Sequence, residues 1–289
     1  LRTLKPKLVK ELETIRDQIR ADGALSPEVT RLFTLKNTMG YSLNSFLDFE
    51  NPLDILTHLM VGSEGTLGFL GEITMGLLPV KKVKATNLLI FESLEVANDS
   101  LMEIISQDPA AIELMDRTSL SALDSQELLP AEVIAVLGKN STAVIVEFEA
   151  DAQEELAEAQ KRFEKKFVKN LVFAGVTENS LRNRLWAMRK NLYAIVAKAR
   201  PEGTTALLED VAVPPEKLTI ACKKLSELCE KHGYGTPVIF GHVRDGNIHF
   251  MISDDFATKE RVKAFENFTA DMVELILSLG GNLKAEHGT

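Results

Sequence analysis

A group of chemically reactive residues lies between two apolar runs in the last fifth of the chain. Residues 238–252 (VIFGHVRDGNIHFMI) carry His242 and His249 on either side of Asp245-Gly246. Asp-Gly between alternating apolar residues is a strong signal for a β-hairpin with a two-residue turn. Such a turn would place His242 directly opposite His249, with Cβ atoms about 4.5–5.5 Å apart. The sequence therefore predicts two imidazoles side by side on neighbouring strands.

Alternation along the strands divides this hairpin into two faces, because successive side chains point to opposite sides. The face predicted to join the core holds Ile239, Val243, Ile248, Phe250 and Ile252. The face predicted to form a site holds Phe240, His242, Arg244, Asn247, His249 and Met251.

Two neighbouring imidazoles are suited to a divalent metal such as Zn, Mn or Fe. Glu286 is the candidate third ligand, and two His plus one Glu leave open positions for substrate, as catalytic sites do. Of the five histidines, three lie in residues 238–252 or in the short stretch 284–288 around Glu286: His242, His249 and His287. The alternative is that the hairpin histidines hydrogen-bond to each other or to water.

The elements that must position these residues follow from periodicity and end signals. Helices are predicted at 5–22, 27–35, from 52 onward, and at 94–107, 151–166, 178–199, 215–232 and 258–279. Strands are predicted at 69–78, 87–91, 110–116, 141–148, 171–174 and 206–213. Short strands separated by single helices predict an α+β fold, an antiparallel or mixed sheet covered by helices, similar to ferredoxin-like units. A Lys-rich connector predicts a domain boundary near residue 84.

A glycine-rich loop, GSEGTLG at 62–68, joins a predicted helix to a predicted strand. This order is the reverse of the strand–loop–helix context of a Rossmann or P-loop motif. The glycines would still allow the backbone to approach a ligand closely. From the residues alone, a plain tight turn and a cofactor loop are equally compatible with the pattern.

Composition narrows the class of protein. A net charge of −9 over 289 residues argues against a nucleic-acid-binding face. No apolar run reaches the roughly 20 residues of a membrane span, and no signal peptide is expected. Cys222 and Cys229 share a helical stripe with Leu218 and Leu225, which predicts a buried face rather than a metal or redox motif. We expect a reducing compartment, the cytoplasm, with attachment to the inner face of the membrane and homodimer formation as open alternatives.

Three motifs in order carry a family resemblance. They are GSEGTLG followed by Glu72-Ile73-Thr74, the run GHxxDGNxH at 241–249, and Glu286-His287-Gly288. Together they resemble the FAD-linked 2-hydroxyacid dehydrogenases of the vanillyl-alcohol-oxidase superfamily. This family includes D-lactate dehydrogenases, glycolate oxidase subunits and D-2-hydroxyglutarate dehydrogenases. Residues 36–49 are most similar to the long bacterial members that carry an iron–sulfur region.

The resemblance implies a division of the chain and a set of site residues. Residues 1–84 would be the C-terminal portion of a PCMH-type FAD-binding domain, and residues 85–289 a truncated ferredoxin-like substrate (cap) domain. FAD would be lined by Asn37, Gly40, Tyr41, Gly62, Ser63, Glu64, Gly65, Thr66 and Gly68. The metal ligands would be His242, His249 and Glu286, the general base His287, and the substrate-binding residues Arg189 and Asn247.

The implied activity is oxidation of a small D-2-hydroxy acid to a 2-oxo acid, with metal-assisted proton abstraction and hydride transfer to FAD. An electron acceptor or an iron–sulfur partner domain would lie outside this chain. The first residue, Leu1, and the end at Thr289, directly after Glu286-His287-Gly288, suggest a piece of a longer protein. We therefore expect this piece to bind FAD weakly or not at all and to have little turnover. The alternative function is a metal-binding ferredoxin-like module without catalytic activity.

Two local questions remain open at the level of sequence. Arg189 is also compatible with a surface ion pair on an exposed helix face. Glu286 and His287 are adjacent, so in a regular strand they would point to opposite faces. Both can serve one site only if the backbone is irregular there.

Overall fold

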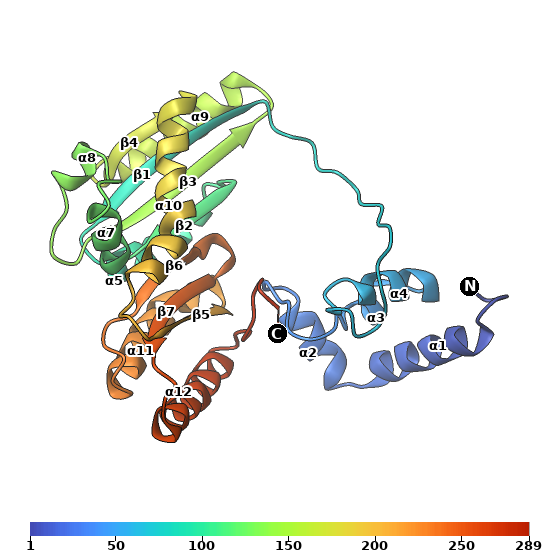
Figure 1. Ribbon diagram of the computed structural model, residues 1–289. Coiled ribbons are helices and arrows are strands. Elements are labelled where there is room, and N and C mark those ends of the chain that lie inside the picture. The colour runs from blue at the N-terminus through green and yellow to red at the C-terminus, as the bar shows by residue number, and fades with distance from the viewer. Residues whose placement is uncertain (289) are drawn as a thin grey trace.

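The computed structural model describes residues 1–288, arranged as a small N-terminal helical unit and a larger domain built on one sheet (Figure 1). The first unit contains α1 (Pro6–Ala21), α2 (Leu25–Leu32), α3 (Ser45–Asp48) and α4 (Pro52–Met60). These helices bury a small apolar core: Leu12, Ile19, Phe46, Ile55 and Leu59. Asn51 caps α4 by accepting from the amide of Leu53, and Pro52 is the first helical residue, as predicted.

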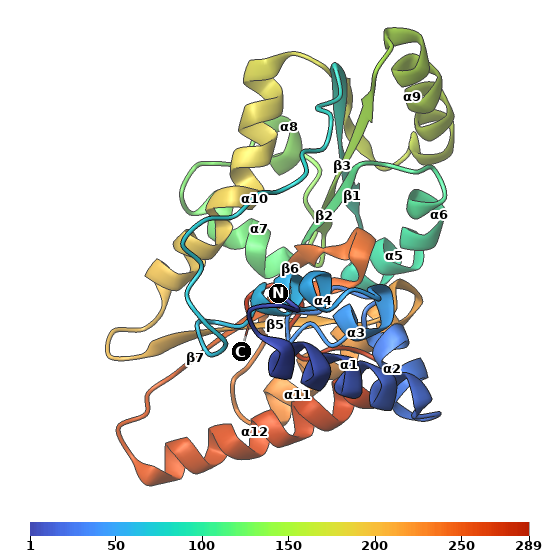
Figure 2. The same ribbon diagram turned by 90° about the vertical axis from the view of Figure 1, so that its right-hand side faces the viewer.

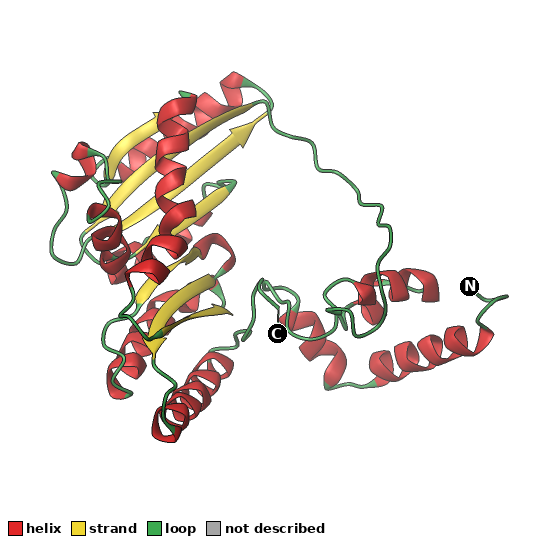
Figure 3. Ribbon diagram, viewed as in Figure 1, coloured by secondary structure: helices red, strands yellow, loops and turns green. Residues whose placement is uncertain are grey.

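The predicted strand at 69–78 is wrong. Residues 69–82 form neither helix nor strand, and Figure 3 shows a long loop between α4 and the sheet. The side chains of Phe69, Leu77 and Leu78 are 94%, 92% and 91% exposed. A strand is stabilised by the ladder it forms with a neighbour. Within residues 1–288 no strand pairs with this segment.

The larger domain is built on a seven-stranded sheet with the order β4-β1-β3-β2-β6-β7-β5, and every ladder in it is antiparallel. Its strands are β1 (Val83–Phe91), β2 (Ala111–Met115), β3 (Thr142–Ala150), β4 (Leu171–Val176), β5 (Thr205–Ala212), β6 (Val238–His242) and β7 (Asn247–Asp254). The first strand begins beside the predicted domain boundary near residue 84, and that boundary stays a prediction.

The sheet consists of two units with the same topology. In the first, β1, β2, β3 and β4 lie in the order β4-β1-β3-β2, with a helical connection after β1 and another after β3. In the second, β7 lies between β5 and β6, and the tail after the last helix reaches the outer edge of β5 through an Ala212–Asn282 bridge. The units join edge to edge where β2 pairs with β6. The predicted α+β class and its ferredoxin-like character are therefore confirmed.

Helices cover both faces of this sheet (Figure 2). One face carries α5 (Leu94–Asp99), α6 (Leu101–Ile105), α9 (Gln153–Phe167), α11 (Leu218–Lys231) and α12 (Lys259–Ser278). The other carries α7 (Arg117–Asp124), α8 (Ala131–Ile134) and α10 (Asn179–Ala199). Cys222 and Cys229 are buried in the first layer, which confirms their predicted core position.

Buried carboxylates on the strands hold α10 against the sheet. Glu147 of β3 accepts hydrogen bonds from Arg182 Nη2 at 2.9 Å and from Trp186 Nε1 at 2.7 Å. One turn further along α10, Arg189 Nε donates to Glu113 of β2 at 2.8 Å. This spacing of four and three residues aligns the three side chains on one helix face.

The predicted two-residue hairpin turn is wrong, although the predicted faces are correct. Phe240 pairs with His249, so the register is shifted by two residues from the predicted His242–His249 pair. Val243–Asp245 form a short 3₁₀ helix (η2), and Gly246 takes a left-handed conformation at φ 68°. A Cβ at Gly246 would collide with the carbonyl of Val213, so glycine is required there. Because a shift of two keeps every strand side chain on its face, the apolar and site faces of β6 and β7 remain as predicted. Arg244 lies in η2 and contacts Ala110 and Asp108 instead.

Asp116, the N-cap of α7, makes stability depend on pH. Its carboxylate accepts from the amide of Ser119 at 2.8 Å, and burial raises its pKa to about 6 from 3.8. The folded state therefore holds this proton over a range where the unfolded state has lost it, and stability falls as pH rises from about 4 to about 6. Asp116→Asn keeps the cap without the charge. We expect the variant to match the wild type in urea unfolding near pH 4 and to exceed it by up to about 3 kcal/mol near pH 8. Parallel stability curves for the two proteins would contradict this.

None of the helices within residues 1–288 is both long enough and apolar enough to cross a membrane.

Candidate metal centre

His242, His249 and Glu286 come together as predicted from the two separate stretches. The Nε2 atoms of His242 and His249 lie 3.0 and 3.1 Å from the same oxygen, Oε1 of Glu286. The two rings meet edge to face with centroids 5.4 Å apart. The diagonal pairing between β6 and β7 therefore brings the imidazoles together without the directly opposed register.

Each of these histidines is paired with a buried carboxylate on the neighbouring strand. Glu113 of β2 is the cross-strand partner of His242, and its Oε1 lies 2.5 Å from Nδ1 of that ring. Asp210 of β5 is the cross-strand partner of His249, with Oδ1 3.5 Å from Nδ1. Ligand histidines commonly direct the second ring nitrogen to a carboxylate, which fixes the tautomer. Nδ1 of His242 is hydrogen-bonded to Glu113, whereas Nδ1 of His249 has no hydrogen-bond partner within the described residues. In both rings Nε2 faces Glu286.

These contacts fit a bound cation. When the rings are neutral and Nδ1 holds the proton, two Nε2 lone pairs and a carboxylate oxygen face one another. Electron-pair donors at such distances repel unless a proton or a cation lies between them. For tetrahedral Zn²⁺ with bonds of 2.0–2.1 Å, ligand atoms are separated by about 3.3–3.4 Å, close to the separations of His242 and His249 from Glu286. The donor set therefore suits a divalent metal, and the assignment of Glu286 and the two histidines as its ligands stays a prediction.

The charges around the centre are mixed. Burial opposes ionisation of Glu286, but His242 and Lys36 outweigh it and the net pKa is lowered. Burial lowers the pKa of His249 to about 4, so this ring is neutral at pH 7. Lys36 Nζ lies 3.1 Å from Oε2 of Glu286 and 3.3 Å from Asp245. The carboxylate oxygen of Glu286 that does not face the histidines, Oε2, is thus paired with the ammonium group of Lys36.

The backbone is irregular at Glu286 and His287, the condition under which both adjacent side chains can face one site. Residues 283–288 form bends rather than a strand, and both side chains reach the site. The ring of His287 stacks on His249 with centroids 5.0 Å apart and planes 13° from parallel. Its Nε2 lies 3.9 Å from Oε1 of Glu286, and its side chain is 47% exposed. A half-exposed imidazole therefore stands beside the three converging ligand atoms.

The side chain of Arg189 is 11% exposed and forms an ion pair with Glu113 rather than lying on an exposed helix face. Its Nε donates to Glu113, and its guanidinium lies 4.7 Å above the ring of Phe240. The carboxylate that holds His242 therefore also holds Arg189 on the site face of the sheet.

Asn247 and Arg244 form their hydrogen bonds with residues other than His242, His249 and Glu286. Asn247 is fully buried and donates from Nδ2 to Asp210 at 2.7 Å and to the carbonyl of Val211 at 3.0 Å. Its expected contact with substrate stays a prediction. Arg244 donates to the carbonyl of Ala110 at 3.0 Å.

The residues expected to line FAD form one loop cluster. Tyr41 and Thr66 join residues 37–41 to the glycine-rich loop at 62–68 through a hydroxyl–hydroxyl hydrogen bond of 2.9 Å. Gly40, Gly62 and Gly65 have φ of 66°, 77° and 80°, left-handed values that favour glycine. Asn37 accepts from the amide of Met39 at 3.0 Å. Their contact with FAD stays a prediction, as it does for Ser63, Glu64 and Gly68.

The loop cluster lies against the metal centre. The amide of Gly288 donates to Thr38 Oγ1 at 3.0 Å, and the amide of Thr38 donates to the carbonyl of Lys284 at 3.0 Å. A Cβ added at Gly288 would lie 2.5 Å from Oε1 of Glu64. In Figure 1 the C-terminal tail accordingly ends beside the N-terminal unit. The three sequence motifs thus meet at one place in the fold.

Three polar residues at this centre were missed by the sequence reasoning: Lys36, Glu113 and Asp210. The two acids have a recognisable signal, since each stands alone on a strand face that is otherwise apolar. On its face of β2, Glu113 lies between Ala111 and Met115, two residues away on either side. On its face of β5, Asp210 lies between Leu208 and Ala212. A buried acid in such a position needs a partner. Lys36 has no comparable signal, because only the fold brings it to Glu286.

Fold and site together define an α+β domain whose sheet carries a two-histidine, one-carboxylate centre. The chain belongs to the family of FAD linked oxidases, C-terminal domain, whose model matches residues 80–289. The resemblance inferred from the three motifs is therefore confirmed.

Curated relatives agree with this family. The chain is 28% identical over 239 residues to glycolate oxidase subunit GlcD of Bacillus subtilis, covering 81% of this chain and 48% of that protein. It is 25% identical over 278 residues to D-2-hydroxyglutarate dehydrogenase of Haemophilus influenzae, covering 91% of this chain and 26% of the relative. It is 25% identical over 291 residues to D-lactate dehydrogenase of Archaeoglobus fulgidus, covering 100% and 58%. The chain thus spans between about a quarter and somewhat over half of these relatives.

Solved structures support the fold. An alkyldihydroxyacetonephosphate synthase matches 80% of this chain and 46% of its own, with a TM-score of 0.55 and 16% identity. The 4-ethylphenol oxidase from Gulosibacter chungangensis matches 73% and 47%, with a TM-score of 0.51 and 14% identity.

Proposed function

We propose that the protein oxidises a small D-2-hydroxy acid to the 2-oxo acid with FAD and a divalent metal, and passes the electrons to a separate acceptor or iron–sulfur partner. The observation that carries the proposal is the convergence of His242, His249 and Glu286, with His287 beside them and the glycine loop against the same tail. The relatives named for glycolate, D-lactate and D-2-hydroxyglutarate support this substrate class.

When bound, the metal would lower the pKa of the substrate hydroxyl, and FAD would accept the hydride from C2. The residues of the chain do the rest. His242, His249 and Glu286 would hold the cation and would leave positions open for the hydroxyl and carboxylate of the substrate. His287 accepts the hydroxyl proton at a ring nitrogen, since its Nε2 lies near Glu286 Oε1 and its ring is partly open to solvent.

Arg189 is suited to bind the carboxylate of the substrate. Only its Nε is used for Glu113, so the two terminal nitrogens remain for a fork-like contact. Stacking over Phe240 holds the guanidinium plane in place on the site face. The proposal therefore assigns charge neutralisation to Arg189 and proton removal to His287.

The proposal is tested by anaerobic mixing of D-lactate, glycolate or D-2-hydroxyglutarate with the longer protein of which this chain is expected to be a piece, loaded with FAD and metal. We expect at least one of them to bleach the visible flavin band, and the L-enantiomers of the chiral acids to leave it unchanged. Removal of the metal by a chelator should slow the bleaching, and added Zn²⁺ or Mn²⁺ should restore it. A metal-loaded protein whose flavin no 2-hydroxy acid reduces would favour the non-catalytic metal-binding module instead.

A further inference from the structure

Asp210 is a buried carboxylate at the junction of three segments that are distant in sequence. It stands on β5, its side chain is 1% exposed, and it faces β7 on one side and the C-terminal tail on the other. Oδ2 accepts from two consecutive backbone amides, Glu286 at 2.7 Å and His287 at 2.9 Å. Oδ1 accepts from Nδ2 of Asn247 at 2.7 Å.

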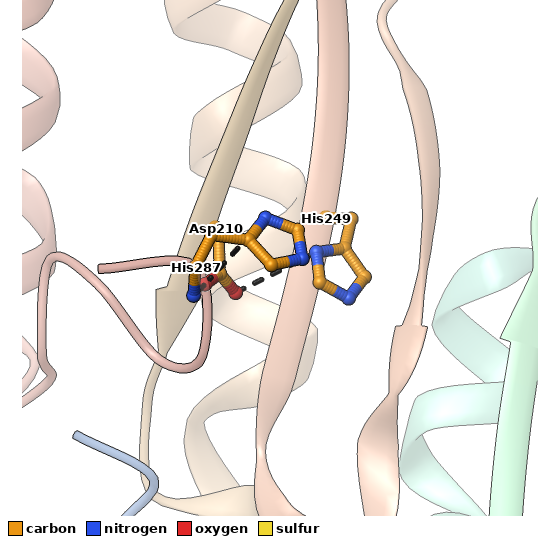
Figure 4. A group of neighbouring side chains, drawn as sticks. All are labelled: Asp210, His249 and His287. Carbon is orange, nitrogen blue, oxygen red and sulfur yellow. Dashed lines mark hydrogen bonds and ion pairs between the residues drawn. The ribbon is translucent and has the colours of Figure 1, made fainter. Parts of the chain in front are cut away.

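The same carboxylate also faces the two imidazoles of the site. Figure 4 shows Asp210 beside His249 and His287, with a dashed line to each ring. The distance from Oδ1 to His249 Nδ1 is 3.5 Å, and the distance from Oδ2 to His287 Nδ1 is 3.9 Å. Burial would raise the pKa of Asp210, but the amides of Glu286 and His287 and the side chain of Asn247 outweigh it, so the net pKa is lowered.

The hydrogen bonds from two successive amides to Asp210 explain how the adjacent side chains of Glu286 and His287 can both reach the site. Adjacent residues in a regular strand point to opposite faces. When two consecutive N–H groups point at one oxygen, the backbone has left the extended conformation. Glu286 and His287 can then both direct their side chains to the centre. The additional hydrogen bond from Ala285 N to the carbonyl of Asp210, 3.1 Å long, fixes the approach of the tail to β5.

We propose that Asp210 is the positioning residue of the metal centre: it bends the tail so that Glu286 and His287 face one site. This inference rests on the metal centre of the proposed function. It assigns Asp210 no contact with substrate, because its side chain is enclosed by Asn247, the tail amides and the rings.

The test is Asp210→Asn, studied in the protein by metal titration and by amide hydrogen exchange. An amide has one acceptor oxygen and cannot satisfy both Asn247 and the tail. We expect Zn²⁺ and Mn²⁺ to bind about 10- to 100-fold more weakly, the range seen when an outer partner of a ligand is removed. The amide protons of Glu286 and His287 should exchange faster, and bound Co²⁺ should give an altered visible spectrum.

A further variant separates positioning from general destabilisation. Asp254→Asn removes another buried strand carboxylate, one that accepts from Tyr234 and Arg261 at the far end of β7. It should lower stability without changing metal affinity.

The outcomes are distinct. Wild-type metal affinity in Asp210→Asn, or an equal loss in Asp254→Asn, would overturn the positioning role while the metal centre stands. If the wild type itself bound no metal, the centre of the proposed function would fail, and the positioning role would fail with it.

Discussion

Replacing His287 by glutamine is expected to lower the rate of flavin reduction by a 2-hydroxy acid about 10²- to 10⁴-fold, the usual contribution of a general base. The ring of His287 stands half exposed beside Glu286 and stacks on His249. Glutamine is of similar length and leaves the backbone amide in the grip of Asp210. The loss should therefore fall on the chemical step, with little change in the affinity for metal or substrate. The measurement is single-turnover flavin reduction in the FAD-loaded, metal-loaded protein.

His58→Gln is the matched control, since His58 lies exposed on α4 and stacks on Phe49 away from the centre. It should reduce flavin at the wild-type rate. A His287→Gln protein with near-normal flavin reduction would exclude His287 as the base. A variant that loses metal instead of rate would make His287 a ligand rather than a base.

The hairpin shows how far local sequence signals reach. Alternation of apolar and polar residues identified the two faces of β6 and β7, because burial acts on every second side chain. The turn was predicted from Asp245-Gly246 alone. The actual turn contains the 3₁₀ helix η2, and Gly246 passes the carbonyl of Val213 at close range, a tertiary contact that no local pattern contains. The faces therefore follow from the sequence and the register does not.

Residues 69–78 illustrate the opposite limit. Their composition is that of a strand, yet β structure is a property of a pair of segments and not of one. The part of the chain that the structure describes gives them no partner, and their apolar side chains lie exposed.

The predicted ligands and the missed residues differ in the kind of information that identifies them. His242, His249, Glu286 and His287 are recognisable by residue type and by motif. Asp210 and Glu113 act through pairing across strands, where each faces one histidine. That pairing depends on the strand order β2-β6-β7-β5, which joins segments about 40 to 130 residues apart. The acid on an apolar strand face was visible in the sequence, but its partner was not.

The double replacement His242→Ala/His249→Ala should remove the metal. These rings supply both nitrogen ligands, so Glu286 alone would remain of the proposed set. Loss of an outer partner costs about 10- to 100-fold in affinity, and loss of two direct ligands should cost more than about 100-fold. Elemental analysis should find about one Zn, Mn or Fe per wild-type chain and almost none in the variant.

Folding must be monitored in the same experiment, because the variant also leaves Asp210 and Glu113 without their imidazoles. His249 is buried, whereas His242 is partly exposed, so the single variant His242→Ala is the milder perturbation. If the centre is real, His242→Ala should keep the circular dichroism spectrum of the wild type and still bind metal far more weakly. His58→Ala, which removes an imidazole outside the centre, should retain the full metal content. Equal metal content in the wild type and in the double variant would mean that the bound metal lies elsewhere. In that case the hairpin histidines would serve Glu286 and the substrate through hydrogen bonds alone, and chelation should leave flavin reduction unchanged.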